Sequence, residues 1–337
     1  MVFKRLLGSL GVGGPVVDTV LDPGAAAPGG TLSGQVHLTG GGADFTIEYV
    51  ALELVARVEA ELDDGESEGT VAFERFIVGG NFRLAEGERR SVPFSVTLPW
   101  ETPITELYGQ GLGIALGVRT ELGVAGAKDK GDLDPVAVRP LPAQEAVLEA
   151  LGQLGFGFES ADLELGHIGG TGQQLPFYQE IELTPAPQYA HQVNEIEVTF
   201  LAGPAGLDVV LEADRRGGMP SEGHDALTRF TVGHHGVERV DWTAEVDGWI
   251  RRLVENHGHH ATPASHDHVA HGGGHHEEGH GHGHRSGPGM GTAVAAGAGG
   301  LAVGVVGGMA AAEVVDEVGD FFEGEDEDDE GHEGDEG

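Results

Sequence analysis

Apolar and polar residues alternate in short runs along the first part of the chain, which is the pattern of strands that bury one face. In residues 31–38, Leu32, Gly34, Val36 and Leu38 occupy one face. Further runs cover residues 45–62, 71–78, 90–98 and 112–124, with turn-forming residues between them. Residues 63–66, Asp-Asp-Gly-Glu, predict a hairpin tip because Asp-Gly favours tight turns. Short strands at this spacing indicate an all-β sandwich.

The second part of the chain repeats the strand pattern and adds two helices. Strands are expected at residues 136–139, 156–165, 177–183, 195–200, 207–214 and 229–232. A helix over 142–154 is predicted because Pro142 stands in its first turn and apolar residues follow at helical spacing. These apolar residues are Ala143, Ala146, Val147, Ala150, Leu151 and Leu154.

The last predicted helix covers residues 237–254. We expect Val240, Ala244, Val246, Trp249, Ile250 and Leu253 to face inward. Arg251 and Arg252 fall in its final turns, where positive charge complements the helix dipole. This helix is expected to close the folded region.

Proline at position 135 holds Asp134 in an extended conformation, so we place a domain boundary there. The predicted domains are residues 1–134 and 135–255, which are followed by segments 256–288, 289–312 and 313–337. Phe3, Leu6, Leu7 and Leu10 have the spacing of a short amphipathic helix. This helix either packs on its own domain or docks between subunits; it is too short and glycine-broken for a secretory signal.

Residues 257–284 are rich in histidine among glycine, serine, threonine and proline, a composition too polar to form a core. Imidazoles bind Ni, Zn or Cu readily near neutral pH, so this segment is either a metal buffer or sensor, or a spacer that binds these ions adventitiously. The candidate ligands are His257, His259, His260, His266, His268, His271, His275, His276, His280, His282 and His284.

Residues 289–312 carry no charge and are long enough to span a bilayer, but their many glycines make insertion marginal. Small residues recur every fourth position, which lets helices approach closely. This ladder is Ala296, Gly300, Gly304, Gly308 and Ala312. The segment is therefore a self-association helix, a flexible linker or a membrane anchor, and the acidic residues 313–337 form a solvated tail.

The formal charge of −38 disfavours nucleic acid and favours basic partners. The chain has no cysteine, which excludes disulfides and thiol catalysis and fits a cytoplasmic protein. His276-Glu277-Glu278-Gly279-His280 matches HExxH, but the flanking glycines oppose the helix that a zinc protease needs. GxSxG at 65–69 lies in an acidic hairpin tip, and the glycines at 109–113 lack dinucleotide-loop spacing. We therefore expect no enzyme and no required cofactor.

Four segments resemble the bacterial sporulation-control M (SpoOM) family. They are KRLLGSLGVGGPVVDTVLD (4–22), LPWETPIT (98–105), VRTELGVAGAKDKGDLDPVAV (118–138) and LPFYQEIEL (175–183). Members of this family look like two arrestin-type, immunoglobulin-like β-sandwiches in tandem. The resemblance covers roughly residues 1–252 and thus implies that fold for both domains.

The resemblance also implies a function. It suggests a cytoplasmic, non-catalytic regulator or scaffold that acts through protein contacts in developmental control, at the start of sporulation or in linked cell-division events. Exposed sandwich edges suit strand addition by an extended peptide. In arrestin-like proteins, charges between the lobes can form a polar core; the candidates here are Lys130, Asp132 and Asp134, and a solvated linker is the alternative. A metal-buffering protein and a membrane-associated adaptor are the competing functions, and a homo-oligomer is compatible with each.

Overall fold

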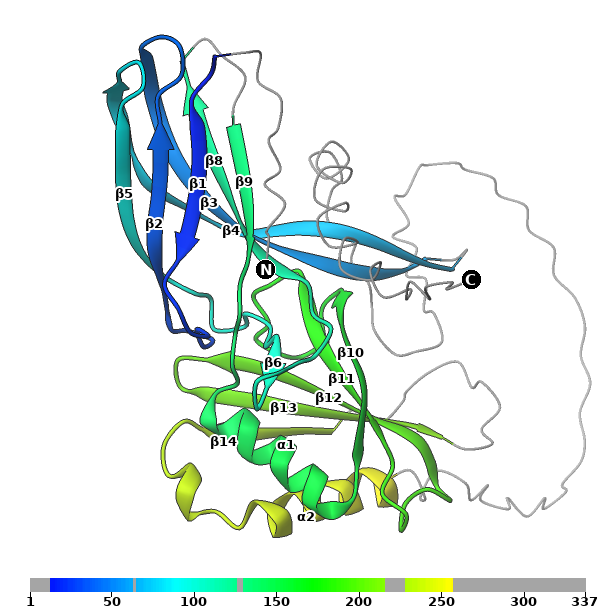
Figure 1. Ribbon diagram of the computed structural model, residues 1–337. Helices are drawn as coiled ribbons and strands as arrows, with labels where there is room; N and C mark the ends of the chain where they lie inside the picture. The colour runs from blue at the N-terminus through cyan, green and yellow to red at the C-terminus, as the bar shows by residue number, and fades with distance from the viewer. Residues whose placement is uncertain (1–12, 63–64, 126–129, 216–227, 257–337) are drawn as a thin grey trace, which may run out of the picture.

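The computed structural model describes residues 13–62, 65–125, 130–215 and 228–256 (Figure 1). The predicted helix at the N-terminus, the tip at 63–64, the histidine-rich segment, the small-residue ladder and the acidic tail lie outside these residues. No helix in the described ranges is long and apolar enough to cross a membrane.

The upper lobe in Figure 1 is a β-sandwich. One layer is a three-stranded sheet in the order β1 (Val16–Leu21), β2 (Thr31–Thr39), β5 (Arg89–Thr97). The other layer consists of β3 (Phe45–Leu62), β4 (Gly65–Leu84), β8 (Leu116–Val124) and β9 (Lys130–Pro135). Alternation explains the layers: Leu32, Gly34, Val36 and Leu38 of β2 are all buried, as predicted, while the residues between them face outward.

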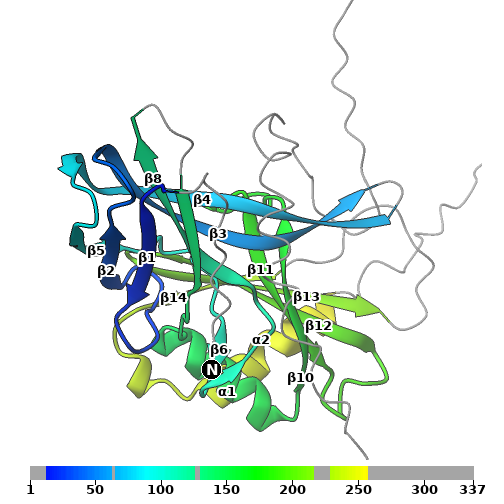
Figure 2. The same ribbon diagram turned by 45° about the horizontal axis from the view of Figure 1, so that its top comes forward.

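The β3–β4 hairpin is longer than its own lobe. β4 begins at residue 65, six residues before the predicted strand, because its polar first part pairs with β3 without a break from Leu62↔Gly65 onward. Figure 2 shows this arm extending over β11 of the lower lobe. The rings of Phe73 and Phe177 meet there edge to face at 5.3 Å.

The lower lobe is built from β10 (Gly157–Leu165), β11 (Phe177–Thr184), β12 (Val193–Gly203), β13 (Gly206–Arg215) and β14 (Thr228–Gly233). These strands are antiparallel to one another, and β10 joins β3 through one parallel pair, Glu164↔Glu59, so that both lobes share a nine-stranded sheet. A two-stranded hairpin, β6 (Glu106–Leu107) and β7 (Gln110–Gly111), stands between the lobes.

Two helices cover one face of the lower sheet, α1 (Pro142–Leu154) and α2 (Trp242–Asn256), preceded by the short helix η1 (Val237–Arg239). The layer opposite this sheet is therefore helical in the described part of the chain, where a second sheet was implied by the resemblance. Val147 and Leu151 of α1 and Ile250 of α2 are buried, together with Ile181 and Val198 of the sheet. The predicted all-β class with peripheral helices is confirmed.

Three further local predictions are wrong. The strand expected at residues 112–124 begins only at Leu116. Residues 136–139 form no strand; they cross between the lobes through single contacts, such as the isolated bridge Ala26↔Val138. The last helix starts at Trp242, because Gly236 adopts a left-handed conformation, Val240 is extended and Asp241 accepts the backbone N–H of Ala244 at 3.1 Å. Val240 and Ala244 are consequently exposed, whereas the other four predicted inward residues of that helix are at least half-buried.

Most buried apolar side chains form one connected cluster through both lobes, and a second, smaller cluster consists of Ile168, Tyr178, Leu201 and Val210. The large cluster includes Val36 and Leu52 in the upper sandwich and Ile196 and Trp249 in the lower lobe. The division into domains at residue 134 stays a prediction.

Candidate functional site: the junction between the lobes

The segment between β5 and β6, residues 98–105, lies at the junction of the two lobes. The Trp100 ring stacks on His234 with ring centroids 5.0 Å apart, and His234 Nε2 lies 2.6 Å from the Gly203 carbonyl oxygen. Gly29 adopts φ +67, and a Cβ there would lie 2.5 Å from the Trp100 ring. Glycine at 29 is therefore required for Trp100 to reach its partner on the lower lobe.

Glu101 of the upper lobe accepts hydrogen bonds from backbone N–H groups of the lower lobe. Its carboxylate accepts the N–H of Gln174 at 2.9 and 2.7 Å and the N–H of Leu175 at 2.8 Å. Hydrogen bonds to an ionised acceptor are about twice as strong as neutral ones. Glu101 thus holds the loop that leads into β11 against the upper lobe.

Gln179, on β11, forms a second set of hydrogen bonds between the lobes. Its Oε1 accepts the Ile104 N–H at 3.0 Å, and its Nε2 donates to the Ile104 carbonyl oxygen at 2.9 Å. Ile104 is fully buried, so no water can replace these bonds. The side-chain amide of Gln179 therefore acts in place of a paired strand.

We expect Gln179→Glu to lower the free energy of unfolding by about 1–2 kcal/mol, because the buried Ile104 carbonyl would lose its donor and meet a carboxylate. Urea denaturation measures the loss. Gln110→Glu, on the exposed β7, is the matched control and should change little. Equal stability of the two variants would contradict the role given to Gln179.

The residues that form both sets of hydrogen bonds belong to segments that carry the family resemblance. Glu101 and Ile104 belong to LPWETPIT, and Gln179 belongs to LPFYQEIEL. Neither Glu101 nor Gln179 was predicted as a site residue. No local signal singled them out, because both motifs contain further polar residues.

The predicted polar cluster lies on β9. Asp132 Oδ2 accepts the Thr19 N–H at 2.7 Å and so ties β9 to β1 within the upper sandwich. Asp134 Oδ2 is buried without a hydrogen-bond partner, and burial, followed by the nearby carboxylates of Asp132 and Asp18, raises its pKa to about 7. The side chain of Lys130 lies outside the described set, and a role of this cluster in lobe orientation stays a prediction.

The histidines of the folded part have unequal surroundings. His167, His191 and His235 are exposed, as expected of surface histidines, while His234 is half-buried at the junction. The candidate metal ligands from His257 to His284 lie outside the described residues, so the predicted metal binding stays a prediction.

The two motifs that resemble catalytic or nucleotide-binding sequences lie in strands. Residues 65–69, which match GxSxG, are part of the extended strand β4, and residues 110–111 of the glycine-rich segment form β7.

The outer face of the lower sheet gathers carboxylates from four adjacent strands. Cross-strand pairing places Asp162 opposite Glu180, Glu182 opposite Glu197, and Glu197 opposite Glu212. We call this the acidic face; it consists of Asp162, Glu164, Glu180, Glu182, Glu195, Glu197 and Glu212. Like charges in adjacent pairs destabilise a sheet. The acidic face therefore stores electrostatic repulsion.

The pKa values of this face reflect burial first and the repulsion second. Burial, followed by the charges of Glu197 and Asp162, raises the pKa of Glu180 to about 9. Burial and neighbouring carboxylates raise the pKa of Glu197 to about 8 and that of Asp162 to about 7. Protonation of these groups near neutral pH therefore relieves part of the repulsion.

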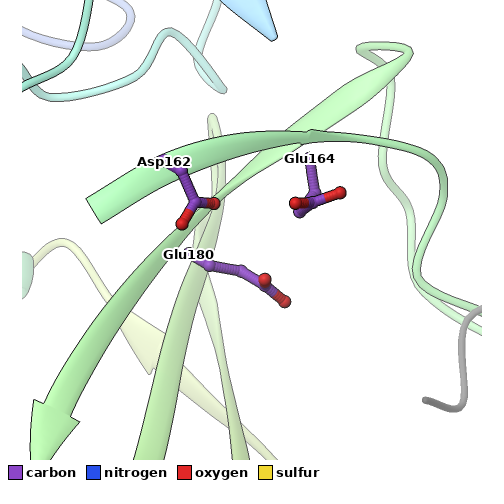
Figure 3. A group of neighbouring side chains, drawn as sticks. All are labelled: Asp162, Glu164 and Glu180. Carbon is purple, nitrogen blue, oxygen red and sulfur yellow. The ribbon is translucent and has the colours of Figure 1, made fainter. Parts of the chain in front are cut away.

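One group on this face has the spacing of a metal site. Carboxylate oxygens of Asp162, Glu164 and Glu180 lie within 4.8 Å of one another, and Figure 3 shows Asp162 and Glu164 on one strand beside Glu180 on the next. Such oxygens suit hard cations such as Ca²⁺ or Mg²⁺ rather than the Ni, Zn or Cu expected for the histidines. Three carboxylates alone do not distinguish an ion site from an acidic surface.

Comparison with known proteins gives one consistent relationship. The sporulation-control protein spo0M of Bacillus subtilis (strain 168) is 38% identical over 215 residues, which cover 64% of this chain and 81% of that protein. The crystal structure of Spo0M from Bacillus subtilis matches with a TM-score of 0.62 at 31% identity, over 73% of this chain and 99% of the other.

A second solved structure, red sea bream transglutaminase, matches with a TM-score of only 0.18 at 10% identity, which is too low to indicate a shared fold. The family described as SpoOM protein matches residues 3–217. This range contains the whole of the upper lobe, α1, β10 to β13 and the junction residues Glu101 and Gln179. The chain therefore belongs to the SpoOM protein family.

Proposed function

We propose that this protein is a non-catalytic regulator or scaffold of sporulation control that acts in the cytoplasm through contacts with other proteins. The observation that carries the proposal is that two segments with the family resemblance contact each other at the junction of the lobes. LPWETPIT and LPFYQEIEL meet at the junction and fix one lobe against the other through Glu101 and Gln179. These contacts are those of a rigid two-lobed protein, and the relative's name supplies the process.

Two features of the frame suit protein partners. β5 ends the small sheet and β14 ends the large one, so each can pair with an extended segment of a partner. The overall charge of −38 favours partners with basic surfaces. The proposal requires no cofactor.

The metal-buffering and membrane-adaptor alternatives depend on residues 257–284 and 289–312, outside the described part of the chain. No contact in the described ranges favours either of them over the regulator.

Genetic complementation tests the proposal. In Bacillus subtilis without its own sporulation-control protein, expression of this full-length chain should shift the sporulation frequency toward that of the parent strain. A Glu101→Ala, Gln179→Glu double variant at the same protein level should restore less, because the lobes lose their fixed orientation. A wild-type chain that leaves the frequency at the deletion level would contradict the proposal.

A further inference from the structure

An open apolar groove with a volume of about 410 Å³ lies between the β6–β7 hairpin, α1 and the adjoining parts of β10 and β11. Leu107 and Leu112 line one side, and Leu148, Leu151 and Phe156 line the other. The groove thus combines residues that directly follow the junction segment 98–105 with residues of the lower lobe. A hollow of this size accommodates two or three apolar side chains of a bound partner.

Two aromatic side chains stand exposed at the rim of this groove. Tyr108 is 63% exposed and Phe158 is 50% exposed. Tyr108 and Gly109 form the two-residue turn of the hairpin with φ +54 and +77, although a left-handed conformation is costly for a bulky residue. Exposed aromatic side chains beside an apolar groove, one of them in an unfavourable backbone conformation, are typical of a binding surface.

The rim is acidic as well as aromatic. Glu149 lines the groove and is exposed, and Glu145 lies one turn earlier on α1. Burial, followed by the charges of Glu149 and Glu145, raises the pKa of the Tyr108 hydroxyl, so both carboxylates act on this rim. The described residues that line the groove include no lysine, arginine or histidine. The charge of the rim is therefore left for a ligand to complement.

An apolar floor with an acidic rim selects the chemistry of its ligand. Lysine or arginine beside apolar side chains complements it, whereas anionic lipid and acidic segments are repelled. A helix satisfies its own backbone hydrogen bonds, while an extended segment would bring unpaired N–H and C=O groups into the apolar floor. The groove therefore fits an amphipathic helix that carries basic residues beside its apolar face.

The shape of the groove depends on the contact that fixes the lobes. Leu107 stands three positions after Ile104, whose backbone Gln179 holds through two hydrogen bonds. Ile181, two positions after Gln179 on β11, lines the groove itself. A change in the orientation of the lobes would therefore alter the groove, and a ligand bound in it stabilises one orientation.

We propose that the groove between the β6–β7 hairpin and α1 binds a basic amphipathic helix of a partner protein. Tyr108 and Phe158 pack against the apolar face of this helix, and Glu145 and Glu149 lie beside its basic residues. The inference rests on the proposed function, because it names the class of partner through which the regulator acts.

A single dye on the full-length protein tests the proposal, because the chain has no cysteine of its own. Gly152 lines the groove, and a Cβ there would meet no atom within 4 Å, so Gly152→Cys can carry an environment-sensitive dye. The probe is a peptide of leucine and lysine, about fourteen residues long, with its leucines on one helical face. Its titration should change the dye signal to saturation at micromolar concentration. A dye at Gly69→Cys, on β4 outside the groove, should not respond.

Substitutions in the Gly152→Cys chain assign the signal to the groove. Phe158→Glu should raise the dissociation constant of the leucine–lysine peptide about tenfold or more. Glu149→Lys should weaken that peptide and strengthen a leucine–glutamate peptide of the same pattern. Glu86→Lys makes the same change in net charge at an exposed turn of the upper lobe and should leave both constants nearly unchanged. Gln179→Glu should weaken binding as well, and circular dichroism confirms that each variant is folded.

A leucine–lysine peptide with a scrambled order has the same charge and no apolar face, so it should give no saturable signal at residue 152. An equal response to the scrambled peptide, or a Phe158→Glu variant that binds as tightly as the parent chain, would overturn the proposal and show that the peptide adheres to acidic surface in general. Failure of the proposed function is a separate result. A chain that complements the deletion but binds no peptide at residue 152 overturns the groove alone, whereas a chain that binds the peptide in the groove without complementing supports the groove and removes the sporulation role.

Discussion

Replacing Glu101 with alanine is expected to lower the free energy of unfolding by about 3 kcal/mol, because two charge-assisted contacts are lost at once. The Glu101 carboxylate receives the N–H groups of Gln174 and Leu175, which lie 73 and 74 positions away in the sequence. Alanine would leave both donors without this acceptor. Glu101→Gln keeps one carbonyl oxygen in place and should lose about half as much, since a neutral acceptor is weaker.

Hydrogen exchange shows whether the loss occurs at the junction. In the wild-type protein, the amides of residues 174 and 175 should exchange slowly, and Glu101→Ala should expose them while the amides of β2 stay protected. Glu86→Ala, at an exposed turn of the upper lobe, is the matched control and should change neither stability nor exchange. Unchanged protection at residues 174 and 175 in Glu101→Ala would show that Glu101 does not hold the lobes.

The elements with a clear period were predictable from the sequence. β3 and α1 have the predicted bounds. β3 is an apolar-rich run of eighteen residues without glycine or proline, and α1 has an apolar stripe at helical spacing over thirteen residues. The first part of β4 was missed because its polar residues have no alternation, and only pairing with β3 makes it a strand. The late start of α2 follows from Gly236 and Asp241, a turn and a cap that the apolar stripe does not encode.

The junction could not be predicted in the same way. Gln179 and Ile104 are 75 positions apart, so their contact depends on how the lobes are placed and leaves no local pattern. The resemblance selected the right segments but gave them no role. Likewise, the sequence shows carboxylates two positions apart at 180 and 182 and at 195 and 197, but only the register of β11 with β12 brings them onto one face.

That acidic face leads to the second large effect, a loss of stability as pH rises. The pKa of Glu180 is about 9 in the folded protein and near its ordinary 4.5 in the unfolded chain, so between these values the folded state binds the extra proton. The free energy of unfolding then falls with increasing pH. The contribution is present in full below about pH 4.5 and is lost as pH passes about 9; Glu197, with a pKa of about 8, adds to the same trend.

Glu180→Gln isolates this contribution, because the amide has nearly the same shape and never ionises. At about pH 9 the variant should be more stable than the wild type by several kcal/mol, and at about pH 4 the two should differ by about 0.2 kcal/mol or less. Urea denaturation across this range measures both, with a chelator present so that no divalent cation neutralises Asp162, Glu164 and Glu180. Glu255→Gln, on an exposed position of α2, should follow the wild-type curve. If Glu180→Gln also runs parallel to the wild type at every pH, Glu180 ionises as freely in the folded protein as in the unfolded chain, and the acidic face carries no stored repulsion.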